Sequence, residues 1–146
     1  MAVALTAHLQ MPTMEPPDKE ARVTIPFETL LQEARGLDLA RVDDRFRLGE
    51  LAEAMRRDHP AGDLFERLAI DLEVDPGQLT EAWYVAMAFP PATRRPDLQW
   101  EIYLILRYHP ERHELVSLAA RHGWDQARVE RELADRFATQ LGRAAG

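Results

Sequence analysis

The sequence predicts an all-α fold, on three observations. Apolar residues recur at spacings of three and four over seven separate stretches, the period of one helix face. The connections between these stretches are short and carry proline, glycine or aspartate, which begin and end helices. Only "RVTI" (22–25) has the pattern of a strand, and a strand without a partner is not stable. We therefore expect a multi-helix domain with two helix-turn-helix-like units.

Residues 1–24 are expected to form a flexible arm that ends in this short strand. They contain Pro12, Pro16 and Pro17 and show little periodicity. The strand would need a second strand from another chain. The helical domain is then expected to cover residues 25–146.

The first two helices follow the arm. An apolar stripe within residues 27–34 predicts the first, which ends at Gly36. The stretch "DDRFRLGELAEAMRRDHP" predicts the second, with Asp43 or Asp44 as its N-terminal cap. The His-Pro pair at its end stops the helix, because a residue before proline avoids helical backbone angles.

The third and fourth helices are separated by a joint of only four residues, "EVDP". Asp63 is expected to cap the third helix, "LFERLAIDL", and Asp75 the fourth. Asp75 stands directly before Pro76, and a capping carboxylate followed by proline at the first helical position is a strong start signal. The fourth helix is expected to run from Pro76 to Phe89.

The last three helices follow a basic loop framed by prolines, "PATRRP". We expect them within residues 97–108, 111–123 and 127–141. A second short joint, "GWDQ", separates the last two, and Asp125 is the expected cap there.

The first joint has the residues that a helix-turn-helix needs, in a unit near residues 63–89. The steep crossing of two helices requires a small residue, here Ala69, and apolar residues that lock the turn, here Leu72 and Val74. Glu73 stands where a turn glycine is usual. The residues expected to face outward from the second helix, toward bases in a major groove, are Gln78, Thr80, Glu81 and Tyr84.

A second unit, near residues 111–139, repeats the arrangement. Ala119 is the small residue, Gly123 stands at the turn and Trp124 fills the joint. The outward residues here are Gln126, Arg128 and Arg131. Between the units, Arg94 and Arg95 are expected to contact phosphates. The alternatives are a plain helical hairpin for each unit and a solvated loop for the arginine pair.

Two segments carry a resemblance: "VDPGQLTEAWYVAMAFPPATRRPDLQWEIYLIL" and "ELVSLAARHGWDQARVERELAD". In this order they resemble the DNA-binding region of ParB/KorB-type partition and plasmid regulators, nearest the LmbU-type regulators of GC-rich bacteria. With the preceding helix the resemblance covers about the last 85 residues. It implies a dimeric, sequence-specific regulator of transcription or of plasmid or phage maintenance. Its reading element would be the helix from Pro76.

The charge distribution supports a different reading. The formal net charge is -7, with 9 basic and 17 acidic residues in 1–89, a balance of -8, and a balance of +1 in 90–146. DNA-binding domains more often carry a positive balance. The alternative function is therefore an acidic helical protein-interaction module, such as a phage or plasmid factor that binds the host transcription machinery.

Other classes of function have little support. There is no cysteine and no His-Glu-x-x-His pattern, and the histidines at 109, 113 and 122 are expected to be surface or cap residues. We expect no metal, no cofactor and no enzymatic activity. No apolar run is long enough for a membrane helix and no signal peptide is recognisable, so the protein is expected to be cytoplasmic.

Overall fold

The computed structural model describes residues 24–95 and 97–145 and is all-helical there, which confirms the predicted fold class. The arm at 1–23 lies outside the described residues, and Thr24 and Ile25 are not in a strand. A short 3-10 helix, η2, covers Pro91–Thr93. The α-helices are α3 (Phe27–Arg35), α4 (Val42–Asp58), α5 (Leu64–Leu72), α6 (Pro76–Ala88), α7 (Trp100–Leu106), α8 (Arg112–His122) and α9 (Gln126–Ala145).

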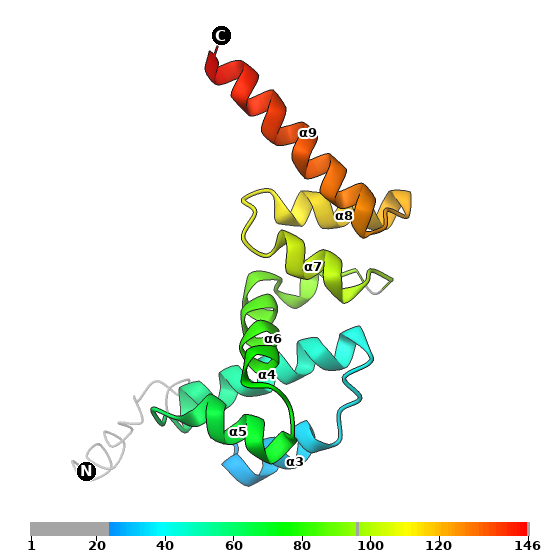
Figure 1. Cartoon of the computed structure of the whole chain (residues 1–146). Coiled ribbons are helices and arrows are strands. Elements are labelled where there is room, and N and C mark those ends of the chain that lie inside the picture. The colour runs from blue at the N-terminus through cyan, green and yellow to red at the C-terminus, as the bar shows by residue number, and fades with distance from the viewer. Residues whose placement is uncertain (1–23, 96, 146) are drawn as a thin grey trace, which may run out of the picture.

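Helix α6 is the centre of the fold. It crosses α4, and it connects the part built from α3, α4 and α5 to the part built from α7, α8 and α9 (Figure 1). The crossing is close because α4 carries Gly49 there: a Cβ atom at this position would lie 2.1 Å from the carbonyl oxygen of Ala82 and 2.7 Å from Cβ of Ala86. Glycine and alanine thus let the two backbones approach each other.

Aromatic side chains connect the two parts. Tyr103 of α7 is fully buried, and its ring makes edge contacts with Phe46 of α4 and with Phe89 at the end of α6. Trp100 also packs edge-on against Phe46, with ring centroids 5.2 Å apart. Such edge-to-face pairs are favourable beyond the area they bury. Between α7, α8 and α9 the core continues with five further buried residues: Leu106, Leu115, Val116, Ala119 and Val129.

One of the expected helix caps is wrong, and a second stands at the expected position without a cap bond. Helix α4 begins at Val42, so Asp43 and Asp44 lie inside its first turn, where Asp44 accepts a hydrogen bond from the backbone N–H of Asp38 (2.8 Å). Asp63 stands at the N-cap of α5 but accepts no hydrogen bond from the helix. A carboxylate near a helix start is favourable even without a cap bond, because it faces the positive end of the helix dipole. An aspartate in the sequence therefore does not by itself predict which residue begins the helix.

Candidate nucleic-acid interface

The joint between α5 and α6 is a tight, locally specified turn. Glu73 has a left-handed backbone (φ 55°), and the N–H of Val74 donates to the carbonyl of Ala69 at 3.0 Å. The carboxylate of Asp75 then accepts from the N–H of Gly77 at 3.1 Å, and Gln78 accepts in return from the N–H of Asp75. This reciprocal pair is a capping box, so the start of α6 is fixed as the sequence predicts.

The joint between α8 and α9 has the same backbone. Gly123 is left-handed (φ 65°), and the N–H of Trp124 donates to the carbonyl of Ala119 at 2.9 Å. Asp125 then accepts from the N–H of Arg128 at 2.8 Å. The left-handed residue, the residue that donates back to the buried alanine, and the capping aspartate each stand 50 positions after their counterparts in the first joint. The chain thus contains one joint geometry twice, each time with a buried alanine where the helices meet.

A matched pair of substitutions tests these turns. A left-handed backbone disfavours residues with a Cβ atom, so we expect Glu73→Gly to raise the free energy of unfolding by about 0.5 to 1 kcal/mol. Gly123→Ala is expected to lower it by a similar amount, although a Cβ there would meet no atom within 4 Å. Urea denaturation followed by circular dichroism measures both. Equal effects of the same sign would contradict the assigned turn geometry.

The predicted reading face of α6 is exposed but carries little positive charge. Gln78, Thr80, Glu81 and Tyr84 are all exposed, as expected. Gln78 belongs to the capping box, and the Thr80 hydroxyl donates to the carbonyl of Pro76 at 3.1 Å. Glu81 lines a small pocket with Arg45 and Glu101. The ring of Tyr84 packs against Tyr108, with centroids 4.9 Å apart. This face therefore offers a carboxylate and aromatic edges.

Arg94 is held inside the protein. Its guanidinium donates to the carboxylate of Glu50 at 2.8 Å and to the carbonyl of Phe89 at 2.7 Å. It also lies over the ring of Phe46, 4.1 Å from the centroid, and its side chain is only 18% exposed. These contacts fasten the end of α6 to α4. Arg94 therefore stabilises the fold, and the expected contact between Arg94 and a DNA phosphate stays a prediction.

Arg95 is also engaged, in the loop before α7. Its guanidinium donates to the hydroxyl of Ser117 at 3.0 Å and to the carbonyl of Arg94 at 3.1 Å. The backbone of Arg95 exchanges hydrogen bonds with the hydroxyl of Tyr103. Burial raises the pKa of that hydroxyl, against the opposing effect of the hydrogen bond to the Arg95 backbone. The basic loop is thus anchored to α7 and α8.

The second unit has more accessible charge. Arg128 covers the ring of Trp124, 4.4 Å from its centroid, and pairs with Glu132 at 3.1 Å. Gln126 donates to Glu130 at 3.3 Å. Arg131 is exposed, and its side chain makes no hydrogen bond or ion pair with any residue that the structure describes.

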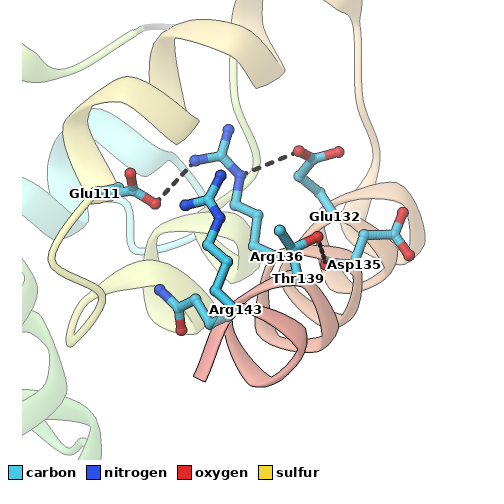
Figure 2. A pocket seen from close by; sticks show the side chains of 7 residues that line it. Glu111, Glu132, Asp135, Arg136, Thr139 and Arg143 are labelled. Carbon is cyan, nitrogen blue, oxygen red and sulfur yellow. Dashed lines mark hydrogen bonds and ion pairs between the residues drawn. The ribbon is translucent and has the colours of Figure 1, made fainter. Parts of the chain in front are cut away.

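Within residues 97–145, two more arginines share this condition, and the sequence reasoning did not select them. Arg121 is exposed in the last turn of α8, and Arg143 lies near the end of α9. Arg143 and Arg136 both line a groove of about 330 Å³, and Figure 2 shows their side chains there. Arg136 is paired with Glu111 (2.9 Å). The only sequence signal for this set was the positive balance of the second half.

The carboxylate of Glu132 is part of the same network. The hydrogen bond from Arg136 holds the pKa of Glu132 below its ordinary value, burial opposes this, and Arg128 lowers the pKa further. Glu132 therefore places a negative charge between Arg128 and Arg136, and Glu111 adds a second one beside Arg136. In α8 and α9, the exposed arginines whose side chains have no partner among the described residues are Arg121, Arg131 and Arg143.

Comparison with protein-family models, with curated proteins and with solved structures finds no match for this chain. The resemblance to ParB/KorB-type and LmbU-type regulators thus remains a prediction from the residues quoted above. Among the residues described here, no helix combines the length and apolar character needed to cross a membrane. Nor do three or more potential ligands gather at a metal site within this part of the chain.

Proposed function

We propose that the protein binds double-stranded DNA through its two helical joints as helix-turn-helix units. The observation that carries the proposal is the repeated joint, which presents the first turns of α6 and α9 on short, fixed connections. A rigid joint suits a reading helix, because base contacts in the major groove require a fixed approach. The resemblance adds the biological role: regulation of transcription or of plasmid or phage maintenance.

We assign the larger part of the electrostatic contribution to DNA affinity to the unit formed by α8 and α9. Arg121 and Arg131 flank the second joint, and neither is neutralised by a carboxylate within the described chain. Phosphate contacts by arginine supply most of the affinity of DNA-binding proteins. The unit of α5 and α6 then contributes Gln78, Thr80 and Tyr84, while Glu81 restricts which bases it accepts, since a carboxylate accepts from cytosine.

Charge reversal tests this assignment. We expect Arg121→Glu plus Arg131→Glu to weaken binding about tenfold or more and to lower the slope of log affinity against log salt by about 2. The matched control is Arg41→Glu plus Arg67→Glu, which changes the net charge equally on exposed residues of the other part. Fluorescence anisotropy with labelled duplexes measures all three proteins. Equal losses in both variants would contradict a localised interface.

The second candidate function is the acidic protein-interaction module. It is favoured by Glu81 on the exposed face of α6 and by the aromatic pair of Tyr84 and Tyr108, the latter 65% exposed. Affinity capture from a bacterial lysate treated with nuclease separates the two functions. Two results together favour this second function. The wild-type chain recovers a basic protein that the Glu81→Arg and Tyr108→Ala variants do not recover, and the wild-type chain binds no DNA at any salt concentration.

A further inference from the structure

The last part of α9 carries an apolar stripe that nothing in the described chain covers. Phe137 is 62% exposed and Leu141 is 55% exposed, whereas Val129 near the start of the helix is fully buried. Ala134 and Ala144 are exposed on the same stripe. In Figure 1 this end of α9 projects beyond the other helices. Large apolar side chains on a projecting helix indicate an interaction surface.

The spacing of the stripe is that of a coiled-coil seam. Its members alternate at intervals of three and four residues: Ala134, Phe137, Leu141 and Ala144. Spacing of this kind matches helices that pair side by side. The positions that border such a seam hold Leu133, Ala138 and Gln140, all uncharged, so two copies meet without like charges at the edge. Glu130, the next seam position toward the N-terminus, ends the stripe.

We propose that α9 pairs with α9 of a second copy of this chain in an antiparallel arrangement centred near Thr139. In this register Phe137 packs against Leu141 of the second copy twice, and Ala134 lies opposite Ala144 at both ends. The two main bodies, which sit at the N-terminal ends of the α9 helices, then lie far apart. A parallel pair would bring them together, although each chain has a net charge of -7.

The pairing is weak and depends on concentration. Ten residue steps separate the first and last members of the stripe, which corresponds to about 15 Å of helix. Stable interfaces bury about 1,200 Å² or more, and a seam this short with two large side chains per copy buries less. Monomer and dimer are therefore in exchange at micromolar concentration, and a ligand that contacts both copies shifts them to the dimer.

The arrangement has a consequence that rests on the proposed function. Arg128, in the first turn of α9, lies eleven residues from the centre of the pair, about 16 Å along the helix. Its two copies are then about 33 Å apart, close to one turn of DNA, which is about 34 Å. The dimer thus spaces the first turns of its two α9 helices, the proposed reading elements of the second unit, for successive half-sites on one side of a duplex.

Sedimentation equilibrium without DNA tests the pairing. The wild-type chain is expected to show a rising dimer fraction with concentration, and Phe137→Glu plus Leu141→Glu to stay monomeric with an unchanged circular dichroism spectrum. Thr139→Glu, on the opposite side of the helix, is the control and keeps the wild-type behaviour. A wild-type monomer up to millimolar concentration overturns the proposal. Sedimentation is measured without DNA, so the two proposals fail separately. A monomeric chain that binds DNA in a separate titration overturns this inference alone. A dimeric chain that does not bind DNA overturns only the proposed function.

Introduced cysteines test the register, since the chain has no cysteine of its own. A mixture of the Ala134→Cys and Ala144→Cys proteins, distinguished by a tag, is expected to form disulfide-linked heterodimers under mild oxidation. Neither protein alone is expected to crosslink to itself, because like positions lie at opposite ends of the pair. Efficient self-crosslinking of Ala134→Cys overturns the antiparallel register.

Discussion

Gly49→Ala is expected to lower the free energy of unfolding by about 3 kcal/mol or more. The added Cβ would lie 2.1 Å from the carbonyl oxygen of Ala82, and the obstacle is backbone, which cannot rotate away. Helices α4 and α6 would have to separate. Since α6 connects the two parts of the molecule, the separation disturbs the aromatic contacts around Tyr103 as well. Urea denaturation followed by circular dichroism measures the loss.

Gly142→Ala is the matched control. It is also a glycine inside a helix, but a Cβ there would meet no atom within 4 Å. Alanine favours helix over glycine, so this variant is expected to gain up to about 1 kcal/mol. A loss below about 1 kcal/mol for Gly49→Ala would mean that α4 and α6 are not in close backbone contact.

Local features of the fold were predictable from sequence, and the two joints show why. The capping box at Asp75 and Gln78 and the turn at Gly123 involve residues within a few positions of each other. Their chemistry is complete in a short window of sequence. The outward direction of Gln78 and Glu81 follows equally from helical periodicity, and the structure confirms it.

Features that depend on distant residues were not predictable in this way. The close crossing at Gly49 was not predicted, because its partner, the backbone at Ala82, belongs to another helix. Whether the charges of Arg94 and Arg131 are available to bind a ligand also depends on tertiary contacts. Glu50, which binds Arg94, stands 44 positions earlier, while Arg131 has no partner in the described chain. Single-sequence reasoning identifies a basic residue but does not show whether its charge is already used.

Arg94→Ala is expected to destabilise the protein by about 2 to 4 kcal/mol, the second largest effect we predict. The side chains of Arg94 and Glu50 are 18% and 28% exposed, so their ion pair is largely shielded from water. Removing the guanidinium leaves the carbonyl of Phe89 without its donor, and leaves the Glu50 carboxylate with only the longer contact from Arg47, at 3.5 Å. It also uncovers the ring of Phe46. Chemical denaturation measures the change.

DNA binding by the same variant separates structure from recognition. If Arg94 acts by fastening α6 to α4, the affinity per folded molecule should stay within about twofold of wild type at a temperature where the variant is folded. Arg94→Lys is the control: lysine keeps the charge but lacks the planar donors that reach Glu50 and Phe89 together. A phosphate contact predicts the opposite pattern. In that case the Arg94→Ala variant keeps the wild-type stability but loses DNA affinity, and its slope of log affinity against log salt falls by about 1. The Arg94→Lys variant then binds DNA almost as well as the wild type.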